Sequence, residues 1–264
     1  MFHFHRANKT LGQNFLKSPH ALAKIVAAAD ISAGETVLEI GPGKGALTRA
    51  LLNAGAHVVA VEKDAQLIPI LQETCATEIS AGTLTLIHGD ILEIKHIEEI
   101  VHTPYKLVAN IPYYITGQII RTFLSEHVQP TRMVLLLQKE VVERIVAHDA
   151  KESLLSLAVK AYGTPKKVAV VKRGDFSPVP NVDSAILLIA DISKKNFPDT
   201  HLEQRFFDIL HAGFSHKRKK LSRNLEAAAE KEAIERAFTT LNLNINTRAE
   251  DLSLETWIRL AQSL

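Results

Sequence analysis

Short apolar runs alternate with stretches of helical periodicity from residue 36 onward, and this alternation constrains the fold more than any other feature of the chain. The first run, Thr36–Ile40, leads into a turn with three glycines in five residues, and a helical pattern follows over 45–54. Runs and helices in this order are typical of βαβ units, which build a parallel sheet flanked by helices. The unbroken apolar run 133–137 indicates a strand that is covered on both faces. We therefore expect an α/β protein.

The pattern places the strands and their connecting helices. Five strands are expected first, at Thr36–Ile40, His57–Glu62, Leu84–His88, 106–110 and 133–138. The helices between and after them are expected at 45–54, 65–77, 119–126, 141–147 and 154–161. Two more strands, 167–171 and 185–190, flank a proline-bearing loop and are close enough in the chain to form an antiparallel pair. The expected sheet is mostly parallel, with an antiparallel closing pair.

After residue 191 the pattern changes. Residues 193–200 are polar with one proline, which indicates a linker. Beyond it the chain offers helical patterns at 202–214, 220–229, 231–241 and 254–264 and no strand candidate. We therefore expect an α/β domain over residues 1–194 and a small C-terminal all-α domain over residues 195–264.

The composition is that of an ordinary globular protein, with 46% hydrophobic and 23% charged residues among 264. No apolar run approaches the roughly 20 residues of a membrane span, and the first residues lack the apolar core of a signal peptide. The single cysteine, Cys75, rules out a disulfide within the chain and suits a reducing compartment. His3 and His5 have no cysteine or carboxylate beside them. We expect a cytoplasmic protein with no metal and no membrane partner.

Positive charge is concentrated in two segments, although the formal net charge is only +2. The denser cluster follows His216 and consists of Lys217, Arg218, Lys219, Lys220 and Arg223. The second consists of Lys166, Lys167, Lys172 and Arg173. Most such clusters are solvated surface, but two of them in a nearly neutral chain indicate a polyanionic partner.

The glycine turn after the first expected strand indicates a nucleotide site. In Glu39-Ile40-Gly41-Pro42-Gly43-Lys44-Gly45, glycines suit a tight turn that a ligand approaches closely, because a Cβ would obstruct both. Glu62 ends the next strand, where its carboxylate can accept hydrogen bonds from both hydroxyls of a ribose. A dinucleotide site is the main alternative, because Gly41, Gly43 and Ala46 also satisfy the G-x-G-x-x-G/A fingerprint.

Positions outside the turn favour S-adenosylmethionine over a nicotinamide dinucleotide. Asp90 follows the third strand, where it can accept a hydrogen bond from an adenine amino group, and Ile91 can cover the ring. Upstream, residues 13–16 precede the first helix and can close over the cofactor.

The segment Asn110-Ile111-Pro112-Tyr113 ends the fourth strand, at the edge where ligands of open α/β sheets bind. An adenine N6 is a poor nucleophile because its lone pair is delocalised into the ring. Two acceptors aimed at its hydrogens, the Asn110 side-chain oxygen and the Pro112 carbonyl, favour a pyramidal nitrogen whose lone pair points at the methyl group. Proline fixes φ and so holds its carbonyl in place, and Tyr113 can stack on the base. These residue types indicate methyl transfer to an adenine N6.

In this order and spacing, the motifs resemble the bacterial small-subunit (16S) rRNA adenine N6,N6-dimethyltransferase family nearly end to end. The resemblance is carried by Gln13-Asn14-Phe15-Leu16, the glycine turn continued through Ala46-Leu47-Thr48, Glu62, Gly89-Asp90, Asn110-Ile111-Pro112-Tyr113-Tyr114, the segment from Phe176 to Ser184 and the segment from Phe214 to Leu225. The family implies a class I methyltransferase sheet, which is Rossmann-like, with a C-terminal helical domain. It also implies transfer of four methyl groups to two adjacent adenosines in the terminal hairpin of the rRNA, on an assembling subunit.

The resemblance assigns roles to individual positions, with S-adenosylmethionine as cofactor and 16S rRNA as partner. Cofactor contacts are expected from Asn14, Leu16, Gly41, Gly43, Glu62, Lys63, Asp90, Ile91 and Asn110. The target base is expected between Asn110, Pro112 and Tyr113 on one side and Phe176 on the opposite face. RNA binding is expected from Lys217, Arg218, Lys219, Lys220 and Arg223, in a chain that is monomeric when free.

One segment departs from the family pattern. The basic stretch usually carries an arginine pair followed by lysine and threonine, whereas here it reads His216-Lys217-Arg218-Lys219-Lys220. The positive charge persists, but a lysine does not reproduce the bidentate fork of arginine. The prediction for this stretch therefore concerns its charge and not the role of any one residue.

Two further alternatives remain open at this point. The related large-subunit (23S) rRNA adenine dimethyltransferases of macrolide resistance share the glycine turn and the catalytic asparagine, and residues 214–225 favour the small-subunit family over them. A ribosome-assembly factor with little catalysis is the other alternative, against which the intact segment from Asn110 to Tyr113 argues.

Overall fold

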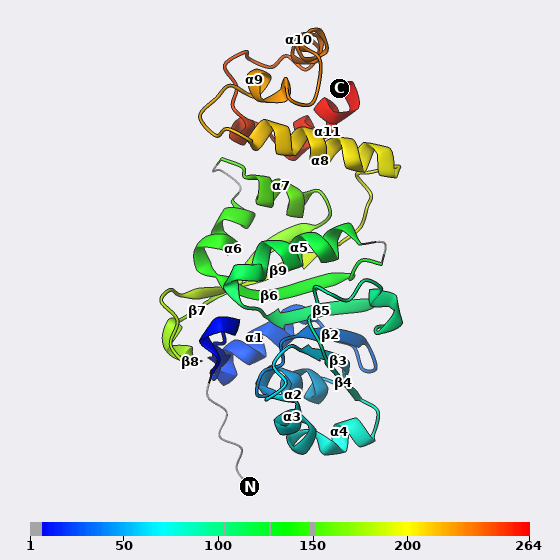
Figure 1. Cartoon of the computed structure of the whole chain (residues 1–264), viewed down its shortest axis with the longest axis vertical. Helices are drawn as coiled ribbons and strands as arrows, with labels where there is room; N and C mark the ends of the chain where they lie inside the picture. Colours follow the sequence, from blue (N-terminus) through cyan, green and yellow to red (C-terminus); the bar gives the residue numbers. More distant parts are fainter. Residues whose placement is uncertain (1–6, 103, 127, 148–150) are drawn as a thin grey trace. The chain divides into compact units, whose positions relative to one another are not determined.

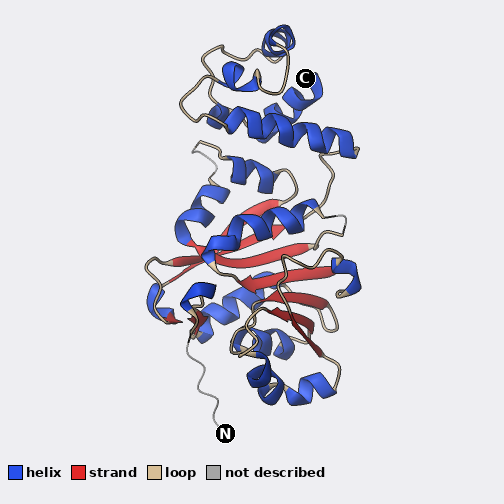
Figure 2. Cartoon of the chain, viewed as in Figure 1, coloured by secondary structure: helices blue, strands red, loops and turns tan. Residues whose placement is uncertain are grey.

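The computed structural model describes residues 7–102, 104–126, 128–147 and 151–264, which form two compact units. The first unit comprises residues 1–143 and 164–192, and the second comprises 144–163 and 193–264. His3 and His5 lie outside the described residues. Strands occur only in the first unit among the described residues, as Figure 2 shows, and the second unit is helical. The predicted α/β fold is confirmed.

A seven-stranded sheet forms the centre of the first unit, in the order β4-β3-β2-β5-β6-β9-β7 (Figure 1). Its strands are β2 (Thr36–Ile40), β3 (His57–Glu62), β4 (Leu84–His88), β5 (Tyr105–Asn110), β6 (Arg132–Gln138), β7 (Thr164–Val171) and β9 (Ser184–Ala190). The first five pair in parallel, and β9 lies antiparallel between β6 and β7. The predicted antiparallel closing pair is therefore confirmed.

Both faces of the sheet are covered, as the unbroken apolar runs indicate. In β6, five consecutive residues from Met133 to Leu137 are buried although their side chains alternate between the faces. Val134 and Leu136 pack on one face in a core cluster with Ile25 of α1 and Leu51 of α2. Burial of a large aliphatic side chain contributes roughly 1.5–3 kcal/mol, so these strand residues hold the sheet between its helices.

Most helices of the first unit come after a strand in the chain and connect it to the next strand. They are α1 (Pro19–Ala29), α2 (Ala46–Asn53), α3 (Ile68–Thr74), α4 (Ala76–Ser80) and α5 (Thr116–Ser125), and α6 (Lys139–Val146) continues into the second unit. Short 3₁₀ turns lie at Lys9–Leu11, Ile97–Glu99, Tyr113–Ile115 and Arg173–Asp175. The single helix predicted over 65–77 is wrong, because Cys75 leaves the helical conformation (φ −124°, ψ 27°) and separates α3 from α4.

A second, two-stranded sheet was not predicted. β1 (Phe15–Leu16) pairs antiparallel with β8 (Phe176–Ser177), and Phe15 lies opposite Ser177. The amide of Lys17 extends this pairing by donating to the carbonyl of Asp175 at 2.8 Å. Strands of two residues carry no periodicity, so only the tertiary structure reveals that the N-terminal segment is joined to the loop before β9.

The second unit contains α7 (Leu154–Lys160), α8 (Thr200–Phe214), α9 (Leu221–Leu225), α10 (Lys231–Thr240), a 3₁₀ turn (Ala249–Asp251) and α11 (Leu254–Ser263). Trp257 of α11 is fully buried and stacks on Phe214 of α8 at 5.7 Å between ring centroids. The helix predicted over 220–229 is shorter than expected, because residues 226–229 form hydrogen-bonded turns instead.

Residues 144–163 belong to the second unit, whereas the sequence suggested one boundary at 194/195. Tyr162 explains this placement, because its hydroxyl donates to Glu203 of α8 and its ring stacks on Phe207 at 5.8 Å. Asn196 adds a hydrogen bond to the carbonyl of Ala161 at 2.7 Å. Contacts between segments this far apart in the chain leave no local mark in the sequence.

Among the described residues, no helix is long and apolar enough to cross a membrane.

Candidate active site

A cavity of about 390 Å³ lies in the first unit at the carboxyl ends of the parallel strands. Residues that follow four strands line it: Gly41 after β2, Lys63 after β3, Gly89 after β4 and Ile111 after β5. The strand order reverses between β2 and β5, which is where open α/β sheets form their ligand crevice. An N-terminal segment, residues 11–17, lines the cavity as well and is called the strap below.

The glycine turn forms one wall of this cavity. Gly41, Gly43 and Gly45 all have positive φ (68°, 61° and 80°), a conformation that strains residues with a Cβ. Gly43 has a second reason to be glycine, because a Cβ there would lie 3.0 Å from the ring of Phe15 in the strap. The turn therefore presents bare backbone to the cavity.

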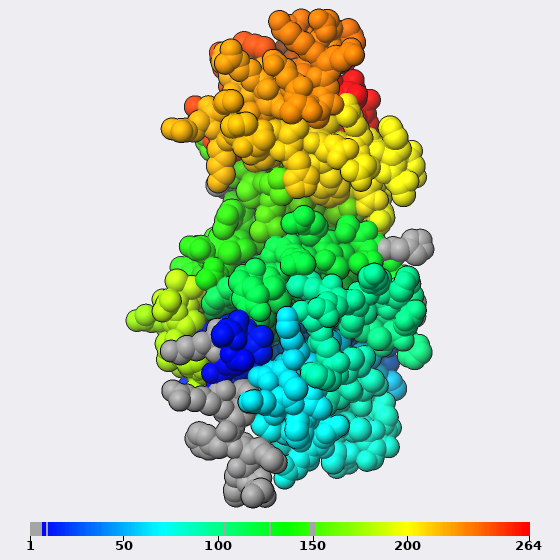
Figure 3. Space-filling model, in the orientation of Figure 1, coloured from blue at the N-terminus to red at the C-terminus, as the bar shows by residue number. Residues whose placement is uncertain are grey.

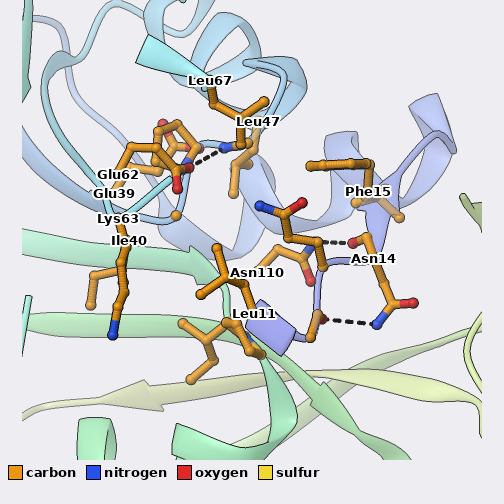
Figure 4. A pocket seen from close by; sticks show the side chains of 18 of the residues that line it. Leu11, Asn14, Phe15, Glu39, Ile40, Leu47, Glu62, Lys63, Leu67 and Asn110 are labelled. Carbon is orange, nitrogen blue, oxygen red and sulfur yellow. Dashed lines mark hydrogen bonds between the residues drawn. The ribbon is translucent and has the colours of Figure 1, made fainter. Parts of the chain in front are cut away.

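Glu62 lies beside the turn with both carboxylate oxygens held. Its Oε2 accepts from the amide of Gly43 at 3.0 Å (Figure 4). Its Oε1 accepts from the amide of Asp64 at 2.8 Å. The side chain is 5% exposed, and this burial raises the pKa of the Glu62 carboxyl above its usual range. Each oxygen retains a lone pair, so the carboxylate can still accept hydrogen bonds from a ligand in the cavity.

Asp90, two residues after the end of β4, lines the cavity and forms an ion pair with Lys63 at 2.6 Å. Burial favours the neutral acid, but the hydrogen bonds from Lys63 and from the amide of Leu92 outweigh it and lower the pKa of Asp90. Ile91 lines the cavity beside it and is 5% exposed. The pair gives this part of the cavity an ionised acceptor next to an apolar side chain.

Glu39 also lines the cavity, and the sequence reasoning gave it no role. It is 1% exposed, and neither carboxylate oxygen has a hydrogen-bond partner among the described residues. Burial raises the pKa of Glu39 to about 8, against a smaller opposing effect of the nearby Thr48 hydroxyl. A glutamate inside the otherwise apolar run Thr36–Ile40 was the signal available in the sequence.

The turn after β5 brings the predicted catalytic residues to the same cavity. Asn110, Pro112 and Tyr113 all line it. The Asn110 side-chain nitrogen donates to the carbonyl of Asn14 at 3.1 Å, so its oxygen is the group left to accept (Figure 4). The Pro112 carbonyl accepts from the amide of Ile115 at 3.2 Å and retains its second lone pair.

Tyr113 is fixed at its far end. Its hydroxyl makes a 2.8 Å hydrogen bond with the hydroxyl of Ser184, a fully buried residue at the start of β9. Burial raises the pKa of the Tyr113 phenol, so the ring stays neutral at ordinary pH. A neutral ring held at both ends is suited to stacking on a flat ligand.

The strap is anchored on three sides of the cavity. Gln13 donates to Asp64 beyond β3 at 2.7 Å, and the Asn14 carbonyl accepts from Asn110 at the end of β5. Phe15 lies below the ammonium group of Lys44 at 5.1 Å from the ring centroid, and pairs with Ser177. Figure 3 shows the N-terminal segment, in blue, at the surface of the first unit. The strap thus covers the cavity with side chains that also bind its walls.

Phe176 is the predicted site residue that the structure places elsewhere. Its side chain is 1% exposed, belongs to the core cluster of the first unit and does not line the cavity, whereas the neighbouring Ser177 does. Leu16, 7% exposed, pairs with Phe176 in the two-stranded sheet and lines the cavity. A place for Phe176 against a base stays a prediction, and it requires the side chain to turn out of the core.

The cationic residues predicted to bind RNA lie in the second unit, four of them between α8 and α9 and Arg223 within α9. Residues 215–220 and Arg223, called the basic loop below, include the exposed side chains Lys217, Arg218, Lys219, Lys220 and Arg223. Within the part of the chain that the structure describes, none of these five forms an ion pair with a carboxylate. Asn224 holds the loop by donating to the carbonyls of Gly213 at 2.7 Å and His216 at 3.1 Å. Five uncompensated cations on one shaped loop make a surface for a polyanion.

The described ranges contain no group of three or more histidine, cysteine, aspartate or glutamate side chains able to hold a metal ion. The second cationic cluster is partly neutralised. Lys167 pairs with Glu143 at 3.2 Å, and Lys172 pairs with Asp183 at 3.1 Å.

Comparison with known proteins gives a family match over nearly the whole chain. The family described as "Ribosomal RNA adenine dimethylase" matches residues 4–264. A "Ribosomal RNA small subunit methyltransferase A" of Dehalococcoides mccartyi (strain CBDB1) is 43% identical over 262 residues, which is 97% of this chain and 87% of that protein.

Two solved structures share the fold. The 23S rRNA methyltransferase ErmE has a TM-score of 0.76 and 25% identity, over 95% of this chain and 99% of its own. A dimethyladenosine transferase from Plasmodium falciparum has a TM-score of 0.76 and 27% identity, over 93% of this chain and 95% of its own. The fold is therefore shared with an enzyme named for 23S rRNA, whereas sequence identity is higher with the relative named for the small ribosomal subunit.

Proposed function

The chain belongs to the ribosomal RNA adenine dimethylase family, and we propose that it methylates N6 of two adjacent adenosines in the 3′-terminal hairpin loop of 16S rRNA, with S-adenosylmethionine as methyl donor. The observation that carries the proposal is the shared cavity. One space of about 390 Å³ joins the glycine turn and Glu62 to Asn110, Pro112 and Tyr113. A cofactor held by the first group and a base held by the second meet within it.

The residues present fit the proposed cofactor. S-adenosylmethionine supplies an electrophilic methyl group on a positively charged sulfur. Glu39 offers a buried carboxyl without a partner among the described residues, which suits a cationic ligand, since a buried charge needs an opposite charge. Glu62 faces the same cavity and suits the ribose, and Asp90 with Ile91 suits the adenine ring.

The chain's own residues activate and position the target amine. The Asn110 oxygen and the Pro112 carbonyl accept the two N6 hydrogens, which draws the lone pair out of the ring and toward the methyl group. Tyr113, fixed by Ser184, stacks on the base. With S-adenosylmethionine bound, the lone pair so directed would displace the sulfur at the methyl carbon, and the excess proton on N6 would pass to solvent. Positioning supplies most of the rate in such a displacement, so no strongly basic side chain is needed.

RNA binding is assigned to the basic loop of the second unit. Its five cations have no acidic partner among the described residues and so are available to phosphates. An unpaired adenosine must be splayed out of its loop to reach an enclosed cavity, which suits an aromatic platform better than groove reading. We expect the chain to act as a monomer in the cytoplasm on an assembling small subunit.

The test is methyl transfer from labelled S-adenosylmethionine to under-methylated small subunits, followed by nucleoside analysis. We expect N6,N6-dimethyladenosine, and primer extension should locate it at two adjacent positions near the 3′ end. Asn110→Ala should abolish transfer while sparing RNA binding. Asn53→Ala, at the exposed end of α2, is the matched control. A normal rate for Asn110→Ala would contradict the mechanism and favour an assembly role without catalysis.

A large-subunit rRNA is the second candidate substrate, because the fold matches the 23S rRNA methyltransferase ErmE as well as it matches the dimethyladenosine transferase. The same primer-extension assay on both subunits separates the two candidates. Methylation confined to the large subunit would refute the small-subunit assignment and leave the chemistry at N6 intact.

A further inference from the structure

Tyr114 is an aromatic side chain that the proposed mechanism does not use. It lines the same cavity as Tyr113, yet it is 64% exposed. Its ring stacks on no aromatic ring, and its hydroxyl makes no hydrogen bond, within the part of the chain that the structure describes. Single exposed apolar residues are common on protein surfaces. Tyr114 differs from them because it lines the cavity of the proposed active site.

The backbone turns the two tyrosines in different directions. Tyr113–Ile115 is a 3₁₀ turn, in which successive side chains project about 120° apart. Tyr113 reaches inward to the buried Ser184. Tyr114 therefore does not face the base that stacks on Tyr113, and it stands at the mouth of the cavity.

The ring of Tyr114 is supported from the strap. A Cβ built on Gly12 would lie 3.3 Å from Cε1 of Tyr114 and 3.3 Å from Cβ of Pro112, so the ring edge packs against bare backbone. Gly12 has a φ of +63°, and its carbonyl accepts from the Asn14 side chain at 3.1 Å. A ring supported in this way loses little freedom when a ligand stacks on it.

We propose that Tyr114 is a stacking platform for the unpaired nucleobase next to the target adenosine, outside the cavity. The inference rests on the proposed function, because it requires an RNA whose target base enters beside Tyr113. A base splayed into the cavity leaves its neighbour at the mouth, where the exposed ring of Tyr114 lies. Stacking tolerates any base, so the platform sets how firmly the RNA is held and does not read sequence.

Stacking of one base contributes about 1–3 kcal/mol by alanine substitution, which corresponds to roughly a 5- to 150-fold change in affinity. Tyr114→Ala should therefore raise KM for the RNA by a factor in that range and leave kcat and the Kd for S-adenosylmethionine within about twofold of wild type. Tyr114→Phe keeps the ring and should behave as wild type. Val168→Ala removes another exposed apolar side chain, one that does not line the cavity, and is the matched control.

Binding is read without catalysis, from a hairpin RNA with 2-aminopurine next to the target adenosine. The wild type and Tyr114→Phe should quench its fluorescence, and Tyr114→Ala should not. Unchanged RNA affinity and quenching in Tyr114→Ala would overturn the proposal, and so would a loss confined to cofactor affinity, which would place the ring over the cofactor. If wild-type protein binds the RNA and quenches its fluorescence but never methylates it, the proposed function is refuted. The comparison of Tyr114→Ala with wild type still tests whether Tyr114 stacks on the neighbouring base.

Discussion

Glu39→Gln should stabilise the cofactor-free protein by about 4 kcal/mol at pH 8 and by only about 1 kcal/mol at pH 5. Glu39 is 1% exposed, and neither of its carboxylate oxygens has a partner among the described residues. Glutamine has the same shape and cannot ionise. The substitution therefore removes the cost of a buried negative charge and little else.

The magnitude follows from the pKa of Glu39. Burial raises it from 4.5 to about 8, whereas the unfolded chain releases the proton near 4.5. Between these values the unfolded state binds fewer protons, so the free energy of unfolding falls as pH rises. The slope is about 1.36 kcal/mol for each pH unit and is smaller near the two pKa values. The free energy of unfolding of the wild type therefore falls by about 4 kcal/mol between pH 4.5 and pH 8. Glu39→Gln avoids that loss, which is a large part of the roughly 5–15 kcal/mol that stabilises a domain.

The assay is urea unfolding of the cofactor-free protein at pH 5, 6, 7 and 8. Circular dichroism reports the whole chain, and the fluorescence of Trp257, the single tryptophan, reports the second unit. For the transition of the first unit, the difference in free energy of unfolding between Glu39→Gln and wild type should grow as pH rises. Glu73→Gln, at an exposed position of α3, controls for loss of one negative charge. Parallel curves for Glu39→Gln and wild type would refute the reasoning, because Glu39 would then be ionised at neutral pH.

Three further predictions address the cofactor, the RNA and the second unit. Affinity for S-adenosylmethionine, measured by titration calorimetry, should rise by up to tenfold per pH unit and level off above about pH 8, because a cationic ligand requires Glu39 to lose its proton. An affinity that stays constant from pH 6 to 8 would contradict this role of Glu39. Replacing the five cations of the basic loop with glutamine should weaken subunit binding and reduce the slope of log K against log salt by up to roughly 3.5 to 4.5. An unchanged slope would place the RNA surface elsewhere. Gly213→Ala should cost about 1–3 kcal/mol in the thermal unfolding of the second unit, because the new Cβ would lie 2.3 Å from the buried ring of Trp257; Gly174→Ala, with open space around its Cβ, should not.

Local features of the sequence were sufficient to predict the strands of the seven-stranded sheet and most of the residues that line the cavity. β3 and β4 have the predicted bounds, because each is an apolar run that ends at a polar turn. The three glycines after β2 were predictable for a local reason as well, since all have positive φ. The glycine turn, Glu62 and Asn110 then had to meet, because the carboxyl ends of neighbouring parallel strands share one edge of a sheet.

Contacts between distant segments were decided only by the tertiary structure. The pairing of Phe15 with Ser177 involves strands of two residues, too short for any periodicity, and Tyr162 joins the second unit through contacts with α8 that no local pattern records. The burial of Phe176 and the raised pKa of Glu39 depend in the same way on what packs around them. The sequence alone thus determined which functional side chains stand at the ends of the strands, because the bounds of a strand and the conformation of a glycine turn follow from local patterns. Which of these side chains are buried, which are ionised and which segments pack on them was decided by the tertiary structure. Burial and its effect on a pKa depend on the residues packed around a side chain and not on the residue alone.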